Sequence, residues 1–180
     1  MKSYLPLLLA LALPAHAEPA HDLAQALNAN ILASSSATLA LEKWCAEHAM
    51  ATPARIQARL LRGSDKPASE EQRARLSVDA ETPLKYRRVQ LYCGEHLMSE
   101  ADNWYVPGRL TAAMNQLLEE TDTPFGKVVQ PLKPYRRTFA TRMLMTGDAL
   151  FEHNAVLYTS ENVPIAEVRE TYQRGALSFR

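Results

Sequence analysis

The feature that most constrains this chain is a series of segments in which apolar and polar residues alternate. A period of two is typical of strands that bury one face. Short turns separate several of these segments, and each turn is tight enough to join antiparallel neighbours. The predicted turns are Gly94-Glu95-His96, Gly147-Asp148 and Ser160-Glu161-Asn162. The predicted strands are 54–62, 84–93, 97–106, 136–145, 150–159 and 163–172.

Helical periodicity appears before and between these strands. Residues 20–33 carry apolar residues at helical spacing, and a serine of Ser34-Ser35-Ser36 can cap a second helix that runs to about His48. Thr111 can cap another helix. Thr123-Pro124 opens a further helical turn. The polar segment Gly63–Pro83 is expected to be a mobile loop or to hold a short helix. The pattern predicts an α+β fold, with an antiparallel sheet covered on one side by helices.

The first seventeen residues have the features of a secretory signal peptide. Lys2 gives a positive start, Leu5 to Leu13 is an apolar run, and Ala15-His16-Ala17 supplies small residues for cleavage. The run is too short to cross a bilayer as a helix, and it lacks the amphipathic period of a buried helix. We therefore expect residues 1–17 to be removed and residues 18–180 to form one periplasmic domain. No lipobox cysteine follows, so a lipid anchor is not expected.

Composition limits the partners of the mature domain. The full chain has 20 basic and 20 acidic residues, and removal of Lys2 with residues 1–17 leaves 19 and 20, so no charge excess favours nucleic acid or anionic lipid. No further apolar stretch predicts a membrane span. The histidines are scattered, and no spacing of metal ligands appears, so no metal is expected. Cys45 and Cys93 can form a disulfide in an oxidising compartment or remain two separate buried thiols, and both interpretations stay open.

The sequence contains no common nucleophile, phosphate-binding or dinucleotide-binding motif. Charged residues inside predicted strands are therefore the candidates for chemistry. Arg88 lies in one strand, and Glu170 lies between Val168 and Tyr172 in the last one, on the face expected to be apolar. The two side chains could face each other across one cavity, with Arg88 holding a carboxylate and Glu170 exchanging a proton. The alternatives are a structural ion pair, or an arginine on a solvated face beside Arg87.

Five motifs in the same order resemble those of chorismate lyases, from about residue 30 to the C-terminus. They are Ser36-Ala37-Thr38 followed by Leu41, Arg88–Gly94 (RVQLYCG), Ala101–Pro107 (ADNWYVP), Thr123-Pro124-Phe125-Gly126 and Val168-Arg169-Glu170. The resemblance implies a six-stranded antiparallel sheet with helices enclosing a buried ligand pocket. It also implies a lyase that eliminates pyruvate from chorismate and leaves 4-hydroxybenzoate, without metal or organic cofactor.

Carried onto this sequence, the resemblance assigns roles to six residues. Arg88 would hold the ring carboxylate, and Glu170 would manage the proton at the ring oxygen. Backbone N–H groups around Phe125 and Gly126 would receive the second carboxylate or the departing pyruvyl group. Ala37 stands where the lyases place a methionine against the ligand, and Asn103 stands where some of them have an arginine.

Two functions follow as hypotheses. The first is an exported chorismate lyase-like enzyme acting on chorismate or a related enolpyruvyl cyclic acid. The second is a non-catalytic periplasmic binder of a small aromatic acid, because the ligand-sensing domains of some bacterial transcription regulators resemble the same fold and bind without chemistry. A structural or assembly protein of the cell envelope is a third and weaker hypothesis.

Overall fold

The computed structural model describes residues 17–63 and 65–179. The predicted signal peptide, residues 1–17, lies almost wholly outside this range. The helices are α1 (Ala17–Leu32), α2 (Ala37–Glu47), α3 (Glu70–Arg75), α4 (Ala112–Glu120) and α5 (Phe125–Val128), with short 3-10 turns at Pro107–Arg109, Gln130–Leu132 and Arg174–Leu177. The strands are β1 (Ile56–Leu60), β2 (Lys85–Cys93), β3 (His96–Tyr105), β4 (Tyr135–Thr146), β5 (Ala149–Tyr158) and β6 (Pro164–Gln173).

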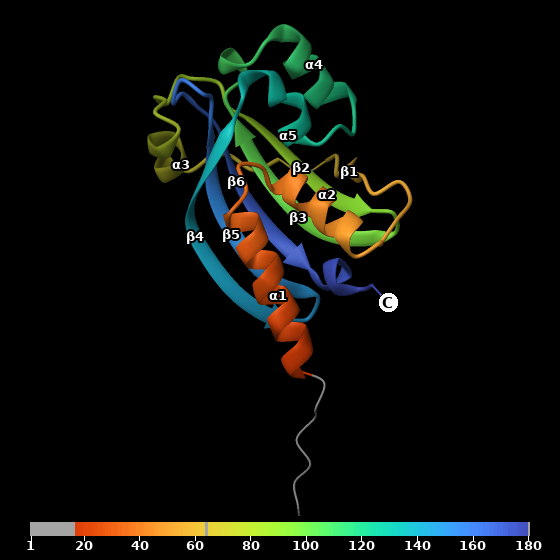
Figure 1. Ribbon diagram of the computed structural model, residues 1–180. Coiled ribbons are helices and arrows are strands. Elements are labelled where there is room, and N and C mark those ends of the chain that lie inside the picture. The colour runs from red at the N-terminus through yellow and green to blue at the C-terminus, as the bar shows by residue number, and fades with distance from the viewer. Residues whose placement is uncertain (1–16, 64, 180) are drawn as a thin grey trace, which may run out of the picture.

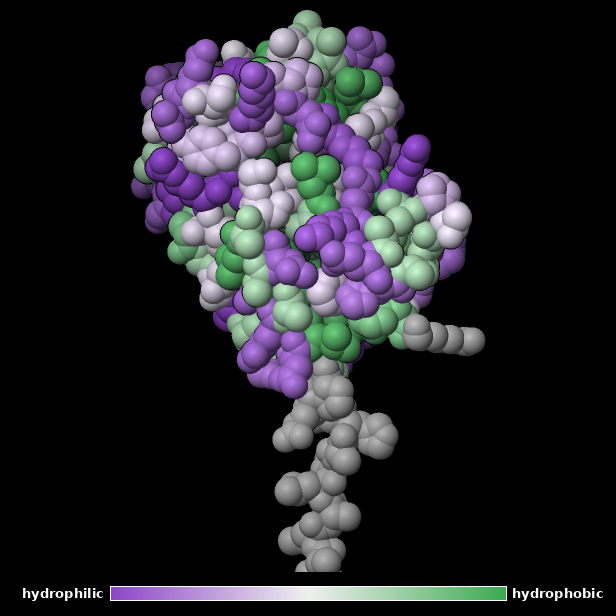
Figure 2. Space-filling model, viewed as in Figure 1, coloured by the Kyte–Doolittle hydropathy of each residue, from purple (hydrophilic) through white to green (hydrophobic). Residues whose placement is uncertain are grey.

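The six strands form one antiparallel sheet in the order β1-β2-β3-β6-β5-β4. Figure 1 shows α1 and α2 in front of this sheet, with α4 and α5 at its upper end. This confirms the predicted α+β class and the helix-covered sheet. We call the face under α1, α2, α4 and α5 the inner face. On the molecular surface seen from the side of α1 and α2, hydrophilic and hydrophobic residues are interspersed (Figure 2).

Alternation along the strands decides which side chains face inward. In β2, Arg87, Val89, Leu91 and Cys93 are buried, whereas the residues between them are partly exposed. In β6, the even-numbered residues from Ala166 to Tyr172 are buried on the inner face. The main core cluster joins these positions to α1 and α2, with Leu27, Ile31, Leu41 and Trp44 among its members.

The opposite, outer face is partly covered by the segment after β1. Ser69 and Gln72 form a capping box that starts α3, so the short helix considered from the sequence is present. Trp104 donates its indole N–H to the carbonyl of Lys66 at 2.9 Å, and Arg75 binds Glu167 through two hydrogen bonds. The segment expected to be a mobile loop is thus attached to the sheet.

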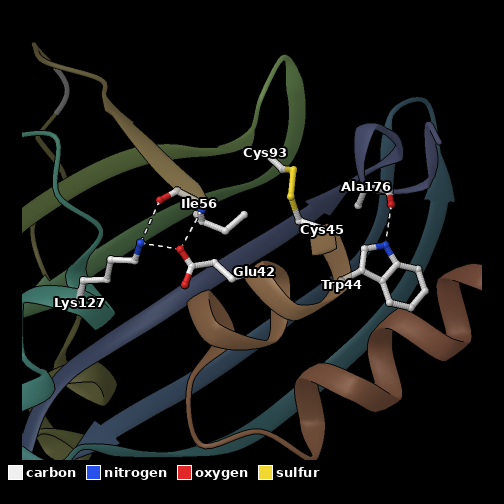
Figure 3. The surroundings of a disulfide bond; sticks show 7 residues. All are labelled: Glu42, Trp44, Cys45, Ile56, Cys93, Lys127 and Ala176. Atoms are coloured by element: carbon white, nitrogen blue, oxygen red, sulfur yellow. Dashed lines mark hydrogen bonds and ion pairs between the residues drawn. A yellow bond between two sulfur atoms is a disulfide. The ribbon is translucent and has the colours of Figure 1, made fainter. Parts of the chain in front are cut away.

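Cys45 and Cys93 form a disulfide that joins the end of α2 to the end of β2 (Figure 3). Both cysteines are fully buried. Nearby, Glu42 of α2 accepts a hydrogen bond from the backbone N–H of Ile56 in β1 and pairs with Lys127 of α5. These links fix α2 relative to β1, β2 and α5. The two possibilities that the sequence left open are therefore decided in favour of a disulfide.

Gly175 allows the chain after β6 to approach β3 closely. A Cβ atom at this position would overlap the carbonyl oxygen of Leu97 and lie 2.9 Å from its backbone nitrogen. Because backbone cannot rotate away, we expect Gly175→Ala to lower the free energy of unfolding by about 1–3 kcal/mol. Urea denaturation measures this change, and Gly108→Ala is the matched control, since nothing lies within 4 Å of its added Cβ. Equal stability of the two variants would contradict the close approach.

Candidate ligand-binding pocket

A small, partly open pocket lies between the inner face of the sheet, the start of α2 and the start of α5. Its volume is about 40 Å³. Its apolar wall consists of Val89, Leu91, Ala101, Leu157, Val168, Pro124, Phe125 and Pro134. Its polar groups come from Ser35, Ser36, Thr38, Asn103, Arg136 and Glu170. Apolar walls with a few convergent polar groups are the usual composition of a small-molecule site.

Arg136 supplies the positive charge of the pocket. It lies at the beginning of β4, directly after the turn that contains Pro134, and only 4% of its side chain is exposed. Nη2 lies 2.8 Å from Glu170 Oε2 as an ion pair. None of its three nitrogens makes a hydrogen bond of regular geometry to any described residue. A guanidinium has five N–H donors, so this buried cation has unused capacity to bind an acceptor.

The ionisation of Arg136 is secured by its surroundings. Burial lowers its pKa, but the negative charge of Glu170 and the neighbouring Tyr172 outweigh burial and raise the pKa above the ordinary value. Arg136 therefore carries its charge at any physiological pH. A buried charge of this kind is stabilised only by close partners, of which the structure gives one carboxylate.

Tyr172 positions the carboxylate of Glu170. The Tyr172 hydroxyl donates a hydrogen bond to Oε2 of Glu170 at 2.9 Å. Burial, followed by the charge of Glu170, raises the pKa of Tyr172 well above its ordinary value, so the phenol stays protonated and remains a donor. Since Oε2 receives both Tyr172 and Arg136, Oε1 is the oxygen left to contact a ligand.

His153 lies beside Glu170 on the neighbouring strand, in direct register with it. The ring is fully buried, and its Nε2 lies 2.6 Å from Oδ1 of Asn28 in α1. Burial is the main cause that lowers the pKa of His153 to about 4. The charge of Glu170 raises this pKa, and the charge of Arg136 lowers it further. The ring is therefore neutral at pH 7, and its Nε2–H donates to Asn28.

We expect this histidine to make stability depend on pH. Its folded pKa of about 4 lies below the unfolded value of about 6.5, so the unfolded chain binds more protons between these values. The stabilisation is complete above about pH 6.5 and is lost as the pH falls towards 4, by roughly 3 kcal/mol in total. Urea unfolding across this range measures the loss, and His153→Gln should remove most of it. A midpoint near 6.5 for the His153 ring protons by NMR would contradict this expectation.

The wall opposite the sheet is built from the first residues of two helices. The Ser36 hydroxyl accepts a hydrogen bond from Leu39 N and caps α2, and Ala37 and Thr38 follow it along the pocket. Gly126 of α5 faces them: a Cβ added there would lie 3.0 Å from the Thr38 hydroxyl. The absence of a side chain at Gly126 thus leaves space in the pocket.

The structure separates Arg88 from Glu170, contrary to the expected pairing. Arg88 pairs across the sheet with Asp102 and binds Glu100 at 3.3 Å on the outer face, with 34% of its side chain exposed. Glu170 pairs with Ala101, whose side chain faces inward. The reason is the pleat: Arg88 is next to the inward-facing Val89 in the chain and must point the other way. Arg88 is therefore excluded from the pocket.

The other five predicted site residues line one cavity. They are Ala37, Asn103, Phe125, Gly126 and Glu170. The sequence reasoning missed Arg136, which provides the guanidinium that was assigned to Arg88. Arg136 and Arg137 are adjacent at a strand start, so a period of two does not decide which one faces inward.

Neither a candidate metal centre nor a membrane-crossing helix is present among the described residues. No group of three or more potential metal-ligating side chains occurs in residues 17–63 and 65–179. In the same part of the chain, no helix is long and apolar enough to span a bilayer.

Comparison with solved structures identifies the fold. The chain resembles the effector domain of PhnF from Mycobacterium smegmatis, with a TM-score of 0.54 and 16% identity, covering 77% of this chain and 88% of that domain. It resembles equally a ligand-binding domain assigned to a GntR-family transcriptional regulator of Bordetella bronchiseptica (TM-score 0.50, 18% identity, 66% and 82% covered). A third neighbour is the possible transcriptional regulator YydK of Bacillus subtilis, with a TM-score of 0.50 and 10% identity. The match covers 69% of this chain and 60% of YydK. The fold is the chorismate lyase-like fold, and at these identities the likeness concerns the fold alone.

Comparison of sequences identifies the family. No protein-family model matches the chain. The uncharacterised protein y4mC of Sinorhizobium fredii is 40% identical over 178 residues, covering 86% of this chain and 75% of that protein. The chain therefore belongs to the same family as y4mC.

Proposed function

We propose that this protein binds a small cyclic or aromatic carboxylic acid in the pocket around Arg136. The observation that carries the proposal is a buried guanidinium whose nitrogens lack aligned hydrogen bonds and which lines a largely apolar cavity. A carboxylate would supply the missing acceptors in a bidentate, charge-assisted arrangement. A ring would pack against Val89, Leu91 and Val168.

Glu170 selects among such acids. A bare carboxylate next to Glu170 would suffer repulsion, so the ligand should carry a hydroxyl or amino donor that reaches Oε1. A hydroxybenzoate satisfies both requirements, with its carboxylate at Arg136 and its donor at Glu170. The effector and ligand-binding domains of regulators share this fold, which supports binding without chemistry.

The pocket must open for such a ligand to enter. A volume of about 40 Å³ holds only a few water molecules, whereas a cavity that binds benzene measures about 150 Å³. Because α2 is tied to β1, β2 and α5, we infer that side chains of the wall opposite the sheet, at the start of α2 and at Phe125, rearrange on binding.

Elimination of pyruvate from a chorismate-like acid is the second candidate function. The observation that favours it is the placement of a guanidinium and a carboxylate 2.8 Å apart in one pocket. Arg136, in place of Arg88, would hold the ring carboxylate. The ring carbon–oxygen bond to the enolpyruvyloxy group would break, and the adjacent ring carbon would lose a proton as the ring becomes aromatic. The released enolpyruvate would take up a proton to become pyruvate, and Glu170 would handle this proton transfer.

One pair of measurements separates the two candidates. Calorimetry with 4-hydroxybenzoate should show binding in the micromolar range, and ligand at about 100 times the dissociation constant should raise the melting temperature by roughly 5–10 °C. Incubation with chorismate, with pyruvate measured enzymatically, detects turnover. Binding without pyruvate supports the binder, and pyruvate formation supports the lyase. Neither binding nor turnover by any hydroxylated cyclic acid would refute both.

We also propose that the protein is exported and acts in the periplasm as residues 18–180. The sequence of residues 1–17 motivates this proposal, and the Cys45–Cys93 disulfide supports it, because such bonds persist in oxidising compartments. Mass spectrometry of the protein isolated from cell fractions should find an N-terminus at Glu18 in the periplasm. A full-length cytosolic chain with free thiols would contradict the proposal.

A further inference from the structure

A second open groove lies beyond the pocket, between the start of β2, the residues after β1 and helix α4. Its volume is about 500 Å³. Leu60, Leu118 and Tyr105 provide its apolar lining, and four basic residues line it against two acidic ones. The basic residues are Arg62, Lys85, Arg87 and Arg88, and the acidic residues are Asp65 and Glu119.

Arg87 is the unusual member of this group. Only 4% of the residue is exposed, and its Nη2 donates to the backbone carbonyls of Thr121 at 3.1 Å and Thr123 at 2.9 Å. Its Nε and Nη1 are buried and have no hydrogen-bond partner among the described residues. No ion pair of Arg87 with a carboxylate occurs among those residues either. A buried cation without an anion is unfavourable unless something else compensates it.

The other basic side chains of the groove bind partners of their own. Lys85 pairs with Glu119, and Arg88 binds Glu100 on the outer face. Arg62 is exposed, and its only hydrogen bond among the described residues is a long one, 3.5 Å, to the carbonyl of Glu119. Burial lowers the pKa of Arg87. Tyr105 and Asp122 act in the opposite direction, and the positive charge of Arg62 adds to the effect of burial. Arg62 and Arg87 therefore line the same groove, and neither forms an ion pair with a carboxylate among the described residues.

We infer that this groove is a second anion site, in which Arg87 and Arg62 together bind a doubly charged oxyanion group such as a phosphate. Two guanidinium groups match the charge and the several acceptor oxygens of such a group. The Tyr105 hydroxyl and the apolar lining give room for an organic portion. The site is distinct from the Arg136 pocket, because the contacting rings of Tyr105 and Phe125 lie between the two.

Titration of the purified chain with inorganic phosphate tests this inference at pH 7.5 and constant ionic strength, with chloride as the reference anion. Calorimetry should show saturable binding of phosphate. Arg87→Met and Arg62→Ala should each weaken it by about tenfold or more, which corresponds to roughly 1.4 kcal/mol. Arg142→Ala, which removes an exposed arginine of β4, is the matched control and should bind as the wild type does.

Arg62→Ala keeps the test decisive if Arg87→Met fails to fold, because Arg62 is exposed. Arg136→Met should leave phosphate binding unchanged, and Arg62→Ala should leave 4-hydroxybenzoate binding unchanged, so failure of one site is distinguishable from failure of the other. Equal phosphate affinity in the wild type and Arg62→Ala, or no saturable binding, would overturn the inference.

Discussion

Arg136→Met should lower the free energy of unfolding by about 3–5 kcal/mol, the largest effect that we expect from one substitution. The reason is that Glu170, with 11% of its side chain exposed, would keep a buried negative charge with no cation beside it. Desolvation of that charge is then uncompensated. Urea denaturation at pH 7 measures the change.

Two further variants identify the cause. Removing both charges with Arg136→Met and Glu170→Leu should recover most of the lost stability, because a buried ion pair can often be replaced by apolar groups at little net cost. Arg88→Met breaks a partly exposed ion pair on the outer face and should cost no more than about 1 kcal/mol. A loss below about 1 kcal/mol for Arg136→Met would mean that the pair is solvated.

Removal of the disulfide should have a comparable effect. Cys45 and Cys93 are 48 residues apart, and closing a loop of that length stabilises the folded state by about 4 kcal/mol in the chain-entropy model. We expect the double variant Cys45→Ser, Cys93→Ser to lose up to this amount, seen as a fall of roughly 10 °C in melting temperature.

Reductant provides the matched control for this variant. Dithiothreitol should lower the melting temperature of the wild type towards that of the double variant and should leave the variant itself unchanged. We also expect weaker ligand binding in the variant, because α2 supplies Ser36, Ala37 and Thr38 to the pocket. A wild type whose melting temperature is unaffected by complete reduction would contradict a stabilising role of the bond.

The fold was predictable because each level of the sequence agrees with it. Alternation located the six strands, turn residues such as Gly147-Asp148 fixed the hairpins, and Ser36 and Thr111 cap helices as expected. The chorismate lyase resemblance implied the same number of strands and added the expectation of a ligand pocket between the sheet and the helices. Five of the six site residues were placed in one cavity for this reason.

The arginine of the site was assigned wrongly. Alternation shows which residues of one strand point to the same side, but it does not show which side of one strand shares a sheet face with a given side of another strand. In β2, Arg88 shares its face with Gln90 and Tyr92, which are partly exposed, whereas Val89 and Leu91 have the apolar character of the neighbours of Glu170. Consistent use of that contrast would have placed Arg88 outside. The inward direction of Arg136 depends on the pairing of β4 with β5, in which Arg136 lies opposite Leu157. The residues around Arg136 alone do not determine its pairing register with β5.

Comparison of 4-hydroxybenzoate affinity between Arg136→Met and Arg88→Met tests the central claim most directly. Both variants lose one guanidinium, but only Arg136 reaches the pocket. Calorimetry should show affinity reduced by about tenfold to a hundredfold or more in Arg136→Met and unchanged in Arg88→Met. Unchanged affinity in Arg136→Met, or a loss in Arg88→Met alone, would contradict a carboxylate site built around Arg136 and Glu170.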